Sequence, residues 1–136
     1  RLGDLVFAAP ERRRVLNGIL HPRIGARSAE RIAALDAAGE PLACYEAALL
    51  VENHLADAFR PLVVVAVPPE VQLARAMARD GSTAEQAGAR VAAQLPLATK
   101  IAAADYVIDN AGDPAATERR ADEVLAAIRA REGGVA

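Results

Sequence analysis

The clearest pattern of apolar positions is a continuous run at residues 62–67, in which leucine, valine and alanine follow one another without a polar residue. A run of this kind, rich in β-branched residues, predicts a strand that is covered on both faces. Pro68 and Pro69 close the run, because proline cannot donate to the interior of a strand ladder. We therefore expect a central strand of a parallel sheet here.

Two helices are predicted near the start of the chain. Pro10 suits the first turn of a helix whose apolar residues recur at helical spacing. Pro22 disfavours a helical conformation at His21, which predicts that the first helix ends there. A second helix is then expected over 22–38, and Gly39 should stop it, since glycine tolerates positive φ.

A second buried strand is expected in the apolar segment 42–51, which lacks the alternation of a half-exposed strand. It should end near Glu46, and a short helix should follow over 53–59. Cys44 lies inside this apolar segment, so we expect a buried, inert thiol. With one cysteine, no disulfide can form within the chain.

Helices dominate after the strand at 62–67. The first should cover 70–79 and end at the Asp-Gly turn of 80–81. Ser82 and Glu85 have the spacing of a capping box, which predicts a further helix to about residue 93. The remaining expected features are a break at Pro96, helical turns over 98–103, a short strand over 106–108, and a last helix that Asp113 and Pro114 open and that ends at 133–134.

Strands that alternate with helices predict an α/β fold, with an open parallel sheet layered by helices and with ligands at the carboxyl ends of the strands. The 136 residues suit one domain. Only about three strands are predicted, fewer than the usual four to six of a stable sheet.

Composition narrows the function classes. The formal net charge of −2 gives no general basic field, so we expect no nucleic-acid partner. No window reaches the roughly 18 apolar residues of a membrane helix, and no signal peptide opens the sequence, which favours a cytoplasmic protein without a membrane partner. The spacing of histidine and cysteine does not suggest a metal site, and no Gly-rich phosphate loop occurs.

Arginines on the predicted helices after residue 68 are the strongest candidates for chemistry. Arg75 and Arg79 lie four residues apart, where like charges repel, so an anion between them would be bound by charge-assisted hydrogen bonds. The alternative is that one of them is solvated and the other caps a helix or pairs with Asp80. Arg90 and Gln94 form a second pair with this spacing, and the two helices could close over a ligand as a lid.

Four other polar residues have both functional and structural interpretations. Glu46 interrupts an apolar segment, where a carboxylate needs a cation, a metal-bound water or several hydrogen bonds. His21 could act in chemistry or cap a helical corner, and Glu52 could receive a substrate hydroxyl or cap the next helix. Asn110 follows a predicted strand, where its amide could read an adenine edge, but it also suits an ordinary turn.

Taken in order, these motifs resemble those of the dephospho-coenzyme A kinase family over nearly the whole chain. The motifs are Val6-Phe7 with Pro10-Glu11, His21-Pro22-Arg23-Ile24, Glu46 to Glu52, Gln72 with Arg75, Arg79 and Asp80, Arg90 with Gln94-Leu95-Pro96, Lys100, and Ala104 to Asn110. The family's usual Asp-x-Pro-Leu-Leu reads Glu46-Ala47-Ala48-Leu49-Leu50 in this chain.

The resemblance implies a three-layer P-loop kinase that phosphorylates the ribose 3′-hydroxyl of dephospho-CoA with ATP and Mg²⁺. It implies acceptor-side helices over 1–41, core strands over 42–68, a lid over 69–104, and a last strand and helix over 105–136. The implied roles are catalysis for Arg75, Arg79 and Arg90, ATP binding for Asn110 and Gln94, acceptor binding for His21 and Glu52, and a water-mediated metal contact for Glu46.

By the same resemblance the family's phosphate loop would precede Arg1, so this chain alone is expected to be inactive. The alternatives are another P-loop kinase for a small molecule or nucleotide, or a degenerate nucleotide-binding or scaffold domain. The sequence does not predict the oligomeric state.

Overall fold

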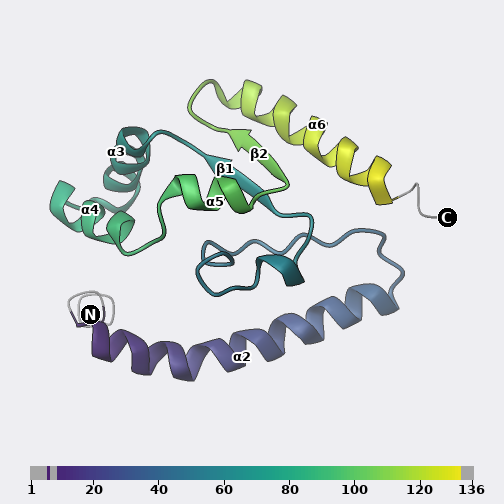
Figure 1. Cartoon of the computed structure of the whole chain (residues 1–136), viewed down its shortest axis with the longest axis horizontal. Coiled ribbons are helices and arrows are strands. Elements are labelled where there is room, and N and C mark those ends of the chain that lie inside the picture. The colour runs from purple at the N-terminus through teal and green to yellow at the C-terminus, as the bar shows by residue number, and fades with distance from the viewer. Residues whose placement is uncertain (1–5, 7–8, 133–136) are drawn as a thin grey trace. The chain divides into compact units, whose positions relative to one another are not determined.

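The computed structural model describes residue 6 and residues 9–132. The chain divides into two compact units, one that ends at Glu46 and one that begins at Ala47. The regular elements are α2 (Pro10–Ala37), a 3-10 turn η1 (Ala56–Ala58), β1 (Val63–Ala66), α3 (Pro69–Asp80), α4 (Ala84–Ala92), α5 (Leu97–Ala103), β2 (Tyr106–Asp109) and α6 (Pro114–Glu132) (Figure 1).

Over residues 10–37 of the first unit the structure has one long helix, α2, where the sequence predicted two. Pro22 lies inside this 28-residue helix, so the expected end at His21 is wrong. An interior proline destabilises a helix by about 3 kcal/mol, because it removes one backbone hydrogen bond and its ring clashes with the preceding turn. The backbone hydrogen bonds of the helical residues on both sides of Pro22 can offset this cost. The predicted stop is confirmed, because α2 is capped by Ala38 and Gly39 has a φ of 74°.

The second unit contains a parallel pair of strands. Val63 of β1 pairs with Tyr106 of β2, and Ala66 pairs with Asp109. Both strands were predicted, within one residue at each end. Among the described residues β1 has β2 as its one neighbour, so the expected central position is not found there.

The predicted strand at 42–51 is wrong. Residues 42–47 lie outside regular structure and 48–54 form turns, and Cys44 is exposed where a buried thiol was expected. A short apolar run does not by itself identify a strand, because a strand also needs a hydrogen-bonded neighbour. The helix expected over 53–59 is reduced to the single 3-10 turn η1.

The hydrophobic core of the second unit lies between the sheet and α6, which runs alongside β2 (Figure 1). Ile108 packs with Val124 and Ile128 of α6, and Val63 and Tyr106 pack against this cluster. Asp113 accepts a hydrogen bond from the N–H of Ala115 and so caps the first turn of α6, as predicted. The expected end of this helix at 133–134 lies outside the described residues.

Replacing Ile108 with valine should destabilise the protein by about 1 kcal/mol, because it leaves a methylene-sized gap in a packed cluster. Ile108 is 7% exposed, whereas Ile101 is 38% exposed. The matched change Ile101→Val should therefore alter the free energy of unfolding by less than about 0.5 kcal/mol. Urea titration of both variants checks the difference, and equal losses would mean that Ile108 is not a core residue.

Helices α3 and α4, which follow β1 in the sequence, pack against each other (Figure 1). Gly81, with a φ of 60°, ends α3 as expected. The capping box is formed by Thr83 and Gln86 instead of Ser82 and Glu85. Both pairs match the motif, and the prediction chose the pair one residue too early.

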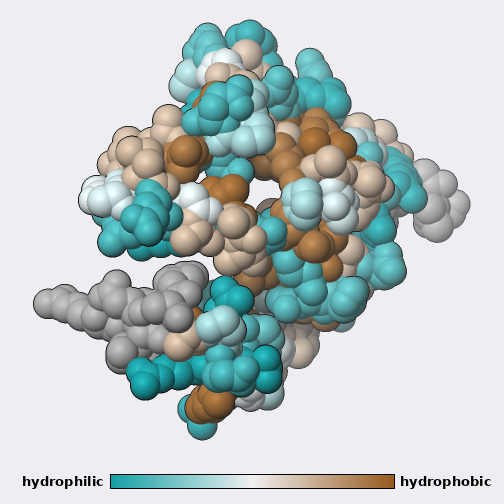
Figure 2. Space-filling model, turned by 60° about the vertical axis from the view of Figure 1, so that its left-hand side comes forward, coloured by the Kyte–Doolittle hydropathy of each residue, from teal (hydrophilic) through white to brown (hydrophobic). Residues whose placement is uncertain are grey.

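Apolar side chains also remain at the surface, as Figure 2 shows by the brown residues among the teal ones. On α2, Val15 is 66% exposed and Ile19 is 52% exposed, and β1 exposes 58% of Val65. In the described part of the chain, every helix is either too short or too polar to cross a membrane.

Candidate functional site at the carboxyl ends of the strands

The two parallel strands end at the same edge of the sheet, and polar residues from three elements meet there. The N–H of Asn110 donates to the carbonyl of Ala66, 2.9 Å away, which continues the ladder past β2. From α3, Nη1 of Arg75 donates to the carbonyl of Asn110 at 2.8 Å. From α6, the hydroxyl of Thr117 lies 3.1 Å from Oδ1 of Asn110. The strand end is therefore linked to both helices.

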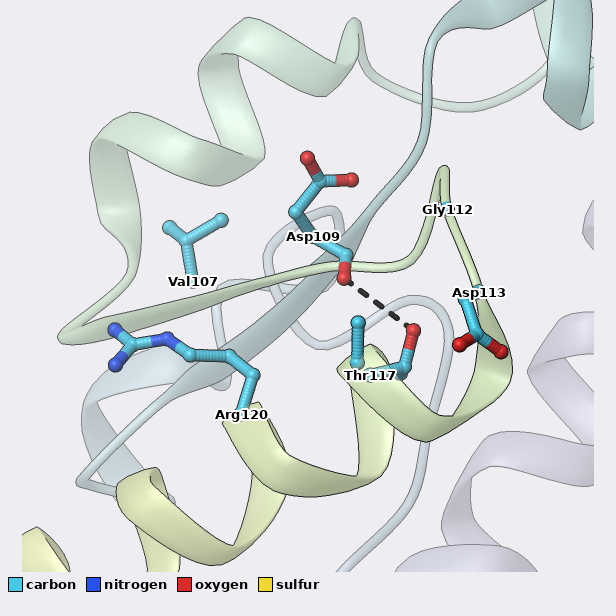
Figure 3. Close-up of a pocket in the computed structure, with 7 residues that line it drawn as sticks. Val107, Asp109, Gly112, Asp113, Thr117 and Arg120 are labelled. Carbon is cyan, nitrogen blue, oxygen red and sulfur yellow. Dashed lines mark hydrogen bonds between the residues drawn. The ribbon is translucent and has the colours of Figure 1, made fainter.

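A surface pocket of about 350 Å³ lies beside this strand end (Figure 3). Its walls come from β2, the loop before α6 and the first turns of α6, and the polar side chains among them are Asp109, Asp113, Thr117 and Arg120. Figure 3 shows the hydroxyl of Thr117 directed toward the carbonyl of Asp109, 3.5 Å away. The pocket carries both acidic and basic groups.

A second polar group lies where α3 meets α4. Arg79 donates to both carboxylate oxygens of Asp80, from Nε at 2.8 Å and from Nη2 at 3.1 Å. Nη1 of Arg90 donates to Oδ2 of the same carboxylate at 2.6 Å. The hydrogen bond from Arg79, helped by the charge of Arg90, holds the pKa of Asp80 below its ordinary value. Two guanidinium groups thus share one ionised carboxylate.

The residues of each expected pair, four apart in the sequence, have different hydrogen-bond partners in the structure. Arg75 and Arg79 lie on the same helix, but Arg75 reaches the strand end and Arg79 binds Asp80. The alternative of a pair with Asp80 is thus found for Arg79. Gln94 lies beyond the end of α4 and has a different partner from Arg90. The arginines form two separate groups.

Lys100 joins three segments in a third, largely buried group. Its Nζ lies 2.7 Å from Oε1 of Glu52 and 2.8 Å from Oε1 of Gln94, and it also donates to the carbonyl of Ala48 at 3.3 Å. The N–H of Leu95 donates to Oε1 of Glu52 as well. The Glu52 and Lys100 side chains are each 15% exposed. This group ties the turn at 48–54 to the α4–α5 junction.

Burial and hydrogen bonding act on Glu52 in opposite directions. Burial by itself would raise the pKa of Glu52, but hydrogen bonds from Lys100 and from backbone N–H groups lower it below its ordinary value. The second carboxylate oxygen, Oε2, is buried and has no hydrogen-bond partner among the described residues. Glu52 is therefore an ionised carboxylate with one unused acceptor.

The other two candidates belong to the first unit. His21 is exposed on α2, within the helix and not at the expected corner. Glu46 is exposed in a segment without regular structure and not at the end of a buried strand. Among the described residues, no group of three or more histidine, cysteine, aspartate or glutamate side chains could hold a metal ion.

Two contact residues were not singled out from the sequence. One is Thr117, whose position one turn after Asp113 and Pro114 could have indicated a hydroxyl near the strand end. Lys100 was named without a role, since its partners lie 6 to 52 residues away in the sequence.

The chain matches known proteins over most of its length. A family model for dephospho-CoA kinase matches residues 1–115. The dephospho-CoA kinase of Anaeromyxobacter dehalogenans is 46% identical over 132 residues, which are 97% of this chain and 63% of that protein. The dephospho-CoA kinase of Geobacter sulfurreducens is 42% identical over 125 residues, which are 92% of this chain and 64% of that protein.

Solved structures agree with these matches. A crystal structure of a Thermus thermophilus protein has a TM-score of 0.75 and 34% identity, and the match covers 92% of this chain and 64% of that one. The dephospho-CoA kinase from Campylobacter jejuni has a TM-score of 0.53 and 28% identity, and the match covers 93% of this chain and 63% of that one. The chain thus spans slightly less than two thirds of the length of these relatives, and within that span it has their α/β fold with parallel strands. The chain belongs to the dephospho-CoA kinase family.

Proposed function

We propose that the complete gene product transfers the γ-phosphate of ATP to the ribose 3′-hydroxyl of dephospho-CoA, which gives coenzyme A in the last step of its synthesis. The match of residues 1–115 to the family carries this proposal. The arginines at the ends of α3 and α4 support it, because phosphoryl transfer depends mainly on cations placed around the phosphates.

In this proposal the described residues position phosphates and stabilise their charge. Arg75, Arg79 and Arg90 supply positive charge as the phosphoryl group moves from ATP to the acceptor oxygen. Arg75 also holds the carbonyl of Asn110, so that phosphate and base contacts would be fixed to one strand end. The general base that takes the hydroxyl proton is not assigned to any described residue.

The proposed nucleotide contacts of Gln94 and Asn110 use amide N–H groups that are not needed for the hydrogen bonds within the protein. Gln94 binds Lys100 through its oxygen, so its amide N–H groups could donate to the nucleotide. The hydroxyl of Thr117 can donate to Oδ1 of Asn110, which would leave the amide N–H groups of Asn110 for adenine. Acceptor binding is assigned to His21 and Glu52 from the family's motifs instead, because Oε2 of Glu52 is buried.

Mg²⁺ would arrive with the phosphates of ATP. Glu46 is a single exposed carboxylate, which suits a contact through a metal-bound water and not a protein-built metal site. No catalytic step is therefore assigned to a metal held by the described residues. We also infer a cytoplasmic location, where ATP is available to the reaction.

The proposal is tested by incubating the complete gene product with ATP and dephospho-CoA. The expected product is coenzyme A, with the new phosphate located on the 3′-oxygen by ³¹P NMR. Adenylate, shikimate and gluconate in equal amounts should not compete with dephospho-CoA. Transfer to one of these acceptors would favour another small-molecule kinase, and failure to transfer phosphate to any of them would favour a non-catalytic nucleotide-binding protein.

A further inference from the structure

Asp80 is the point at which two arginines from different helices meet. It is the last residue of α3, directly before Gly81, whose left-handed conformation turns the chain toward α4. Arg79 comes from the last turn of α3, and Arg90 comes from the last turn of α4. The Asp80 side chain is 23% exposed, whereas Arg79 is 77% exposed and Arg90 42% exposed. The carboxylate is therefore the least exposed member of this group.

Without a carboxylate between them, the two guanidinium groups would repel each other and move apart. Asp80 removes that repulsion, because Arg79 and Arg90 donate to the same oxygen, Oδ2. The three side chains together keep a net charge of +1. The bidentate contact of Arg79 uses Nε and Nη2, which leaves Nη1 for a ligand.

We propose that Asp80 is a positioning residue for the proposed phosphoryl transfer, one that keeps Arg79 and Arg90 together as a double guanidinium site for one phosphate group of the nucleotide. Asp80 itself does not touch the nucleotide, since an anionic oxygen beside a phosphate would be repelled. The expected effect on kcat rests on the proposed function. The expected effect on ATP affinity does not, because ATP binding can be measured without an acceptor substrate.

The experiment compares Asp80→Asn with Glu85→Gln in the complete gene product. Glu85 is an exposed carboxylate in the first turn of α4, so both changes remove one negative charge from the same pair of helices. A pure charge effect should strengthen ATP binding in both variants, and most where the lost carboxylate is nearest the arginines, as in Asp80→Asn. Positioning predicts instead that Asp80→Asn weakens ATP binding by about fivefold and lowers kcat by about tenfold, whereas Glu85→Gln changes either by less than twofold.

Asp80→Glu restores the carboxylate and should bring kcat back to within about threefold of the unchanged protein. Calorimetric titration with ATP alone gives the affinity of each variant, and thermal melting identifies any variant that has lost its fold. Stronger ATP binding in Asp80→Asn, equal behaviour of Asp80→Asn and Glu85→Gln, or no recovery in a folded Asp80→Glu, overturns the inference. If dephospho-CoA is not phosphorylated at all, the proposed function fails, and the ATP titrations still decide the role of Asp80.

Discussion

In the complete gene product, replacing Arg79 and Arg90 together with glutamine should lower kcat for the proposed phosphorylation of dephospho-CoA by about a hundredfold to a thousandfold. Glutamine keeps polar N–H groups but removes the charge that would stabilise the phosphates as the bond to the leaving oxygen breaks. Because both side chains are exposed and bind Asp80 at the surface, the fold should not depend on them. Steady-state kinetics at saturating ATP measure the loss.

The matched control is the pair Arg119→Gln and Arg129→Gln, which removes two exposed arginines of α6. This variant has the same net charge as the Arg79 and Arg90 variant, so a general field effect would lower kcat equally in both. We expect kcat of the control to stay within about twofold of the unchanged protein. A similar loss in both variants would assign the effect to net charge and not to the two arginines at Asp80.

Replacing Lys100 with methionine should destabilise the protein by about 2 to 3 kcal/mol at neutral pH. Glu52 would lose its cation while it remains 15% exposed, and Gln94 and the carbonyl of Ala48 would each lose a donor. Urea titration measures the loss. Arg14→Met removes a cation from an exposed pair with Glu11 and should leave the unfolding midpoint unchanged.

The pH dependence of stability tests whether Lys100 stabilises the protein through Glu52. Its folded pKa is lowered, so its contribution to stability is present above the unfolded pKa and is lost as the pH falls through the lower folded value. The unchanged protein should therefore lose more stability than the Lys100→Met variant between about pH 5 and pH 3. Changing Glu52 to leucine in the same variant should recover most of the loss at pH 7. No recovery would show that Lys100 acts through other contacts.

The elements predicted well from the sequence are those with strong local signals. Residues 62–67 combine β-branched side chains with two following prolines, and Gly81 adopts the left-handed conformation that ends α3. The elements predicted badly depend on the surroundings. Pro22 is a helix breaker by local preference, yet α2 continues through it. The segment at 42–51 has strand-like composition, but no strand within 9–132 pairs with it.

The functional roles of the site residues stay predictions, and of their contacts the sequence anticipated the one between Arg79 and Asp80. The spacing of Arg75, Arg79 and Arg90 indicated anion chemistry, but it could not show that Arg75 would reach Asn110, 35 residues away. Nor could it show that Asp80 would bind both other arginines, because the contact with Arg90 depends on the angle between two helices. Contacts between distant segments need the tertiary fold, which periodicity does not supply.

The proposed action of the arginines on the transferring phosphoryl group is tested most directly by affinity for a transition-state mimic. ADP with aluminium fluoride and dephospho-CoA imitates the group in transfer, whereas ADP alone lacks it. In calorimetric titrations of the complete gene product, changing Arg79 and Arg90 to glutamine should weaken the aluminium fluoride complex by about a hundredfold and ADP binding by less than about threefold. Equal weakening of both, or no weakening of either, would contradict a role for these arginines in phosphoryl transfer.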